Sequence, residues 1–329
     1  MITIARLFLV FMILATIVVF YVAGIGSFPD YDNYLKIADG AEFFVSEHDY
    51  MFEWFSRYLL DLEGVSATQK VFVLAIVNQF VCVVFFAWVG LKRLPEQVYG
   101  ALFLFCMFGF LFMTTTLRAS AAYLCISAFF LRNARFDYLG IALLVISMAW
   151  HDSAAPVVVI IILSILLDKI CFRYKIKERV LSRFFVFLIL SSGALVLLAG
   201  LLRPLIPTLI GFDLGARTAY FEGDGGYSIS KSLFIIFSII CSYCFIADLQ
   251  QTRISIFFIA LMVLVLALFN LLNGIVAVRF SFFIFAVMLP LRGVFISGVE
   301  KNLQFRISSI VISPIVMYLS VLYTFSNTL

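Results

Sequence analysis

The chain of 329 residues is 64% hydrophobic and only 13% charged, and its mean hydropathy is +1.13. A soluble globular protein needs far more polar side chains to cover its surface, so this composition excludes that class. The sequence instead predicts an all-α polytopic membrane protein, folded as a single integral membrane domain over residues 1–329.

Hydrophobic stretches follow one another along almost the whole chain. A helix needs about 20 apolar residues to cross the hydrocarbon layer, and tilt widens that range. On this basis we predict about eleven transmembrane helices, the shortest of which flank His151. Their expected positions are residues 3–24, 70–91, 97–117, 118–134, 137–150, 154–168, 184–202, 229–247, 254–272, 274–291 and 307–325.

The distribution of Lys and Arg predicts the orientation in the membrane, because cytoplasmic segments carry the excess of these residues. If the amino terminus is inside, the inner connecting segments hold 15 of the 23 Lys and Arg residues. We therefore expect the amino terminus inside and, after an odd number of spans, the carboxyl terminus outside.

Signatures of several other chemistries are missing from the sequence. The six cysteines lie within predicted spans or on the inner side, so no disulfide framework is expected. Cys241 and Cys244 have the spacing of a metal-binding pair, but they lie inside an apolar helix with no histidine nearby. There is no nucleotide-binding loop and no basic aromatic surface. We expect no metal, no cofactor and no nucleic-acid partner.

The first predicted outer loop, residues 25–68, is the expected periplasmic segment and is too long to be a simple connection. Within it, Met51, Phe55 and Tyr58 recur at helical spacing and give one apolar face. We predict an interfacial helix over residues 41–62 that lies on the outer leaflet.

Acidic and aromatic residues share this loop, with Asp30, Asp32 and Tyr34 near its start and Glu47 and Tyr50 further on. Carboxylates beside tyrosines can hydrogen-bond sugar hydroxyls or accept a proton from one. The alternative is a solvated acidic loop, and the sequence leaves both interpretations open.

A second predicted outer loop, residues 203–228, is interrupted by prolines and glycines. We expect it to run along the membrane surface, where it is a candidate lid over a long substrate. Arg203 and Arg217 lie in this loop and are candidates for binding an anionic substrate. The alternative is that each arginine anchors the loop to lipid phosphates.

Three further cations lie deeper in the apolar sequence. Arg118 separates two spans, His151 ends one span and precedes another, and Arg279 lies several residues inside its span. Such a position costs a few kcal/mol, which favours a functional explanation. Arginine also matches phosphate oxygens with a planar fork of donors, so a pyrophosphate is a suitable ligand. The alternatives are a hydrogen-bonded core histidine for His151 and a buried ion pair for Arg279.

Two short segments carry a resemblance to a known family. The sequence TTTLRASAAYL, with Arg118, and the sequence MAWHDSAAP, with His151, resemble the central block of the EpsG-type, Wzy-like polysaccharide polymerases. The late segment VAVRFSFF, with Arg279, is similar to that family's arginine-aromatic helix. Residues of the first outer loop resemble its acidic-aromatic stretch and its Glu-Pro-x-aromatic element, although His48 stands in place of the proline.

The resemblance implies a polymerase of the bacterial inner membrane, related to the glycosyltransferase C superfamily. Such enzymes join lipid-linked oligosaccharide repeat units at the outer face, where they move a growing chain from undecaprenyl pyrophosphate onto the next unit. The expected partners are the undecaprenyl-pyrophosphate-linked oligosaccharide, membrane lipid and a chain-length regulator.

On this interpretation, one of three residues accepts the proton of the acceptor hydroxyl: Asp32, Glu47 or His151. The others bind the pyrophosphate or the glycan: Arg118, Arg279, Arg203, Arg217, Asp30, Tyr34 and Tyr50. Two other functions remain as alternatives. A flippase for lipid-linked oligosaccharides would also bind a pyrophosphate with arginines, and a membrane acyltransferase would also use a histidine.

Overall fold

The structure, a computed structural model of the full chain, contains helices and no strands in the part of the chain that it describes. The all-α class is therefore confirmed for these residues. The described residues are 2–28, 31–38, 64–93, 95–176, 178–202, 229–247, 252–272, 274–291, 315, 317, 318 and 321.

Six of the described helices are long and apolar enough to cross a membrane. They are Thr3–Ala23, Ala67–Lys92, Gln97–Thr114, Ala154–Arg173, Arg253–Leu271 and Gly274–Leu291. Shorter apolar helices cover the other predicted spans up to residue 291. The predicted span 307–325 lies almost wholly outside the described residues, as do the predicted interfacial helix 41–62 and the candidate lid 203–228. The total of eleven spans stays a prediction.

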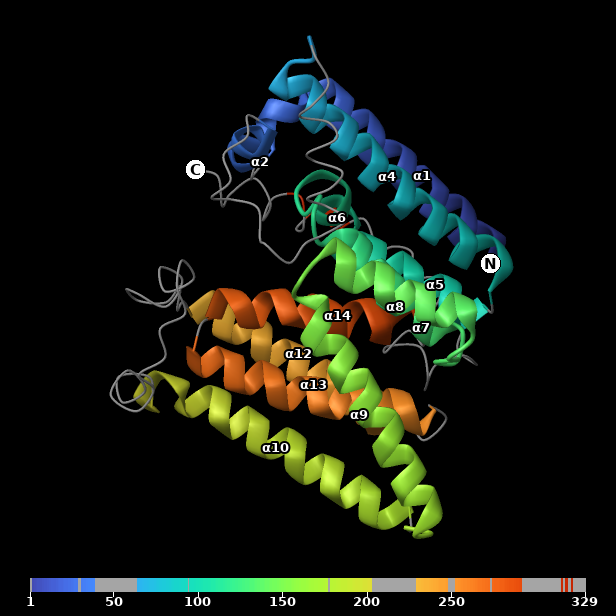
Figure 1. The fold of residues 1–329 in the computed structure, drawn as a ribbon, viewed down its shortest axis with the longest axis vertical. Helices are drawn as coiled ribbons and strands as arrows, with labels where there is room; N and C mark the ends of the chain where they lie inside the picture. The colour runs from blue at the N-terminus through green and yellow to red at the C-terminus, as the bar shows by residue number, and fades with distance from the viewer. Residues whose placement is uncertain are drawn as a thin grey trace. The chain divides into compact units, whose positions relative to one another are not determined.

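The chain divides into two compact units, residues 1–155 with 289–329 and residues 156–288. The single integral membrane domain over residues 1–329 stays a prediction. The helices of Figure 1 are α1 (Ile2–Ala23), α2 (Tyr31–Ala38), α4 (Ala67–Lys92), α5 (Pro95–Leu104), α6 (Phe110–Thr114), α7 (Ser120–Leu131), α8 (Tyr138–Trp150), α9 (Ala154–Arg173), α10 (Glu178–Leu202), α12 (Ile229–Ala247), α13 (Arg253–Leu272) and α14 (Gly274–Leu291).

In the first unit, α1 and α4 lie side by side, and α7 and α8 form an antiparallel pair (Figure 1). The α1 helix exposes large apolar side chains at helical spacing, among them Leu7, Phe11, Leu14 and Val18. A continuous apolar stripe of this kind is expected on a face that meets lipid. The polar Thr16 is buried on the other side, and its hydroxyl donates to the Met12 carbonyl at 2.9 Å.

Helices α5 and α6 form one apolar rod through a π-helical turn, Phe105–Gly109. In this turn the Phe105 ring lies directly over Gly109, where a Cβ atom would meet the ring Cγ at 2.6 Å. Only glycine leaves room for this ring, which is fully buried. The sequence prediction of a span near residues 97–117 agrees with the helix Gln97–Thr114.

Helix α2 was not predicted from the sequence. Its apolar positions Tyr31, Tyr34, Leu35 and Ala38 nevertheless have the spacing of one helix face, and all four pack against a buried cluster of the first unit. The cluster also contains Phe20 of α1, Val71 of α4, Phe110 of α6 and Leu117, and Trp150 packs against it. The segment predicted to be the first outer loop therefore begins with a helix docked onto α1, α4 and α6.

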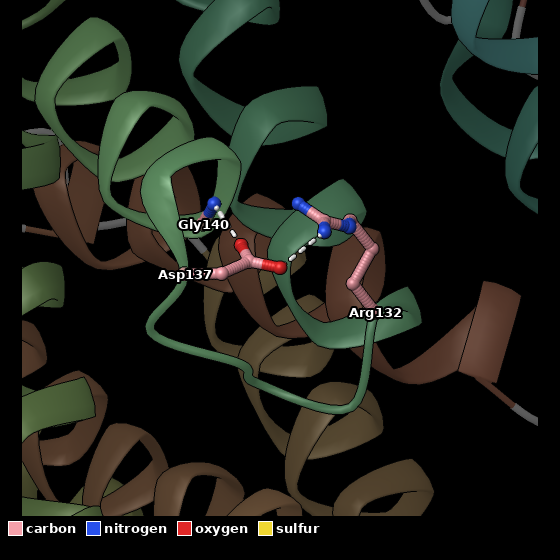
Figure 2. Close-up of polar contacts among 3 residues, drawn as sticks. All are labelled: Arg132, Asp137 and Gly140. Atoms are coloured by element: carbon pink, nitrogen blue, oxygen red, sulfur yellow. Dashed lines mark hydrogen bonds and ion pairs between the residues drawn. The ribbon is translucent and has the colours of Figure 1, made fainter.

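The turn between α7 and α8 is held by Asp137, the residue that precedes α8 (Figure 2). Its Oδ1 accepts a hydrogen bond from the Gly140 N–H at 2.8 Å, and its Oδ2 lies 2.6 Å from the Arg132 guanidinium. The hydrogen bond from Gly140, and with it the charge of Arg132, holds the pKa of Asp137 below its ordinary value of 3.8.

Replacing Asp137 with Asn is expected to lower the Tm at neutral pH, because the ion pair with Arg132 is lost. A carboxylate whose folded pKa is lowered stabilises the fold above its ordinary pKa, and that contribution is lost as the pH falls through the lowered value. The Tm difference between wild type and variant should therefore be constant at neutral pH and shrink below pH 3.8. An unchanged difference in acid would contradict this assignment.

In the second unit, α13 packs against both α10 and α12 (Figure 1). Aromatic pairs join its helices: Phe185 with Phe257 at 5.1 Å, Phe234 with Phe285 at 5.8 Å and Phe269 with Phe280 at 4.6 Å between ring centroids. Buried serines in these apolar helices donate to the carbonyl four residues earlier, so their hydroxyls remain satisfied without water.

All six cysteines lie within described helices, and all are free. Four of them are buried and Cys125 is half-buried. Cys244 is exposed on α12, where Ile240 and Tyr243 are also exposed.

Candidate functional site

The site begins at a break in the apolar sequence. Helix α6 ends at Thr114 and α7 begins at Ser120, so the five residues between them are not helical. The Leu111 carbonyl accepts hydrogen bonds from both the Thr115 and the Thr116 N–H, at 2.9 and 3.0 Å. Arg118 lies in this break and is half-buried. The predicted interruption of the apolar sequence at Arg118 is therefore confirmed as a break between two helices.

A break of this kind leaves carbonyl groups of the preceding helix without their usual partners, which is costly away from water. Two adjacent amides of α4 supply the missing donors. Asn78 Nδ2 donates to the Phe112 carbonyl at 2.6 Å, and Gln79 Nε2 donates to the Met113 carbonyl at 3.4 Å. Asn78 Oδ1 also accepts a hydrogen bond from the Ser120 hydroxyl. Asn78 thus joins the end of α6 to the start of α7.

Helix α2 also holds the break, through Tyr34. Tyr34 of α2 is 8% exposed, and its hydroxyl donates to the Thr115 carbonyl at 3.2 Å. The same hydroxyl accepts a hydrogen bond from the backbone N–H of Arg118, also at 3.2 Å. This arrangement gives Tyr34 a structural task, and the predicted contact of Tyr34 with a glycan stays a prediction.

His151 lies at the turn between α8 and α9 and is 6% exposed. Its backbone N–H donates to Ser147, and its Nδ1 lies 3.3 Å from Asp152 Oδ1. A carboxylate at this distance favours the tautomer with the proton on Nδ1, which leaves Nε2 as a proton acceptor. Asp152 is the site residue to which sequence reasoning gave no role, although it follows His151 directly.

Arg118 and His151 lie at the same end of the first unit. The Ser147 hydroxyl of α8 donates to the Ala122 carbonyl of α7 at 3.3 Å, so the end of α8 lies beside the start of α7. Leu117 and Trp150, the residues before Arg118 and His151, both pack against the buried cluster that carries α2.

Asp32 belongs to the same end of the unit. It is exposed in the first turn of α2, two residues before Tyr34. Asp32, Tyr34, Arg118 and His151, which come from distant segments of the sequence, therefore lie at the same end of the first unit.

Arg279 lies in the second unit, at the sixth position of α14, and its side chain is exposed. The predicted role of Arg279 in binding pyrophosphate stays a prediction. The remaining candidates lie outside the described residues: Asp30, Glu47, Tyr50, Arg203 and Arg217.

The chemistry open to the site follows from Arg118, Asp32 and His151. A half-buried guanidinium can bind an anionic group, and a carboxylate and an imidazole nearby can accept a proton. Within the described ranges, no cluster of three His, Cys, Asp or Glu residues with the geometry of a metal site occurs.

Comparisons of the chain with protein-family models, curated proteins and solved structures found no match.

Proposed function

We propose that the protein is a polysaccharide polymerase that joins undecaprenyl-pyrophosphate-linked oligosaccharides at the outer face of a bacterial inner membrane. The proposal rests on one observation. Arg118 lies in the hydrogen-bonded break between α6 and α7, at the same end of the first unit as Asp32 and His151. The predicted orientation, with the amino terminus inside, puts this end on the outer side. The resemblance of the segments around Arg118 and His151 to Wzy-like polymerases supports the same function.

The proposed reaction is glycosyl transfer. A hydroxyl of the acceptor sugar attacks the anomeric carbon of the donor, and the bond from that carbon to the pyrophosphate oxygen breaks. The bonding electrons leave with the lipid pyrophosphate, whose added charge Arg118 stabilises. The hydroxyl proton passes to Asp32 or His151, with Glu47 as the third candidate. Because the donor is already activated, orientation and charge stabilisation are the main tasks of the protein.

A strain that lacks this protein tests the proposed function, and the chain lengths of its surface polysaccharide are measured. We expect the ladder of long chains to collapse to a single repeat unit, because units are exported but not joined. Complete loss of the polysaccharide, with lipid-linked units trapped inside the cell, would instead identify a flippase.

Complementing the same strain with variants assigns the proton acceptor. At matched protein levels, we expect Asp32→Asn to abolish long chains and His151→Gln to leave a weakened ladder, since a loose transition state demands little early proton removal. An inactive His151→Gln variant beside an active Asp32→Asn variant would move the role to the histidine.

A further inference from the structure

Two tyrosine hydroxyls attach helix α2 to the rest of the first unit. The Tyr31 hydroxyl lies 3.2 Å from the Thr68 hydroxyl near the start of α4, in an exposed position. The Tyr34 hydroxyl is buried and bonds to the backbone of the break, at Thr115 and Arg118. The two contacts resemble each other chemically, but only the second reaches the segment that holds the arginine.

The hydrogen bonds of the break show why Tyr34 matters for Arg118. The N–H groups of Thr115, Thr116, Leu117 and Ala119 all donate to carbonyls of residues 111–116. The N–H of Arg118 instead donates to the Tyr34 hydroxyl. A backbone donor that is partly buried needs such a partner, so the position of Arg118 depends on a helix that is 84 residues away in the sequence.

We propose that Tyr34 is a positioning residue: its hydroxyl fixes the backbone of Arg118 and so sets where the guanidinium meets the pyrophosphate. The catalytic part of this inference rests on the proposed function, whereas the link between Tyr34 and Arg118 does not. Asp32 is on the same helix, two residues before Tyr34. The Tyr34 hydroxyl therefore also fixes the distance between Arg118 and Asp32, a candidate proton acceptor.

The first experiment measures backbone hydrogen exchange of residues 115–119 in lipid nanodiscs. Tyr34→Phe keeps the ring in the buried cluster and removes only the hydroxyl, so the Arg118 amide should exchange at least several-fold faster. Tyr31→Phe is the matched control, since it removes a hydroxyl from the same helix without touching the break. Equal exchange at Arg118 in wild type and Tyr34→Phe would overturn the proposal.

The second experiment measures polymerisation by the reconstituted protein with a lipid-pyrophosphate donor. The Arg118 guanidinium stabilises charge that develops in the transition state, so its misplacement should lower kcat. For Tyr34→Phe we expect kcat to fall roughly 10-fold with little change in KM. A merely structural loss would lower the amount of active protein and leave kcat per folded molecule unchanged, as expected for Tyr31→Phe. An unchanged kcat in Tyr34→Phe overturns the positioning role.

A third measurement separates this inference from the proposed function. Inorganic pyrophosphate is titrated into the wild type, Tyr34→Phe and Arg118→Gln proteins. We expect the affinity to weaken in both variants, and more in Arg118→Gln. If the wild type forms no polymer but Tyr34→Phe still weakens pyrophosphate binding, the proposed function fails and the positioning of Arg118 stands. Equal affinity in wild type and Tyr34→Phe counts against the positioning of Arg118.

Discussion

Polymer formation is expected to fall by roughly 100-fold when Arg118 is replaced by Lys. Lysine keeps the charge but loses the planar fork that holds two phosphate oxygens, and its shorter reach changes where the charge lies. The position is half-buried in a break whose backbone is fixed from two sides, so neighbouring groups are poorly placed to compensate. Polysaccharide ladders and kcat measurements at matched protein levels check this result.

Arg135→Lys is the control for the Arg118 variant. Arg135 is an exposed residue of the turn between α7 and α8, at the opposite end of α7 from Arg118, and its replacement should leave the ladder unchanged. Arg279→Lys tests the second predicted cation in the same assay, with a sharp loss of polymer expected. Full activity in both Arg118→Lys and Arg279→Lys would show that a bidentate grip on pyrophosphate is not used.

The largest loss of stability is expected from Asn78→Leu. Leucine has the same number and branching of non-hydrogen side-chain atoms, but it removes the donor to the Phe112 carbonyl and the acceptor of the Ser120 hydroxyl, both in a buried position. Each buried group left without a partner costs about 1–3 kcal/mol, so we expect the free energy of unfolding to fall by roughly 2–4 kcal/mol. Equilibrium unfolding in detergent micelles measures the change.

A double variant tests whether the hydrogen bonds are responsible. Adding Ser120→Ala removes the hydroxyl that Asn78→Leu leaves unpaired, so the double variant should be more stable than the sum of the single effects predicts. Strictly additive losses would mean that the Asn78–Ser120 contact contributes little and that the break is held in another way.

Much of the fold was predictable because hydrophobicity is a local property of the sequence. The apolar runs gave the helix positions up to residue 291, and the cluster of three threonines and Arg118 gave the break between α6 and α7. Helix α2 was missed because it has only eight residues and three of them, Asp32, Asn33 and Lys36, are polar. Its helical spacing of Tyr31, Tyr34, Leu35 and Ala38 was nevertheless visible in the sequence.

The support of the candidate site was less predictable, because it depends on residues far apart in the chain. Asn78 and Gln79 bond to carbonyls 34 residues later, and Tyr34 bonds to a carbonyl 81 residues later. A single sequence gives no information on which distant segments meet. One chemical feature of the sequence did indicate this contact. Two adjacent amide side chains inside an apolar helix need hydrogen-bond partners, and the carbonyls at a helix break need donors.

The cysteines of this chain have a practical value for mapping its topology. All six thiols lie within apolar helices, where a charged, water-soluble reagent has little access. The natural sequence can therefore serve as the background into which single new cysteines are introduced at exposed polar positions. Asp32→Cys and Arg135→Cys lie at opposite ends of the first unit. Labelling of intact cells with a charged maleimide then reveals the side of the bilayer on which each end lies.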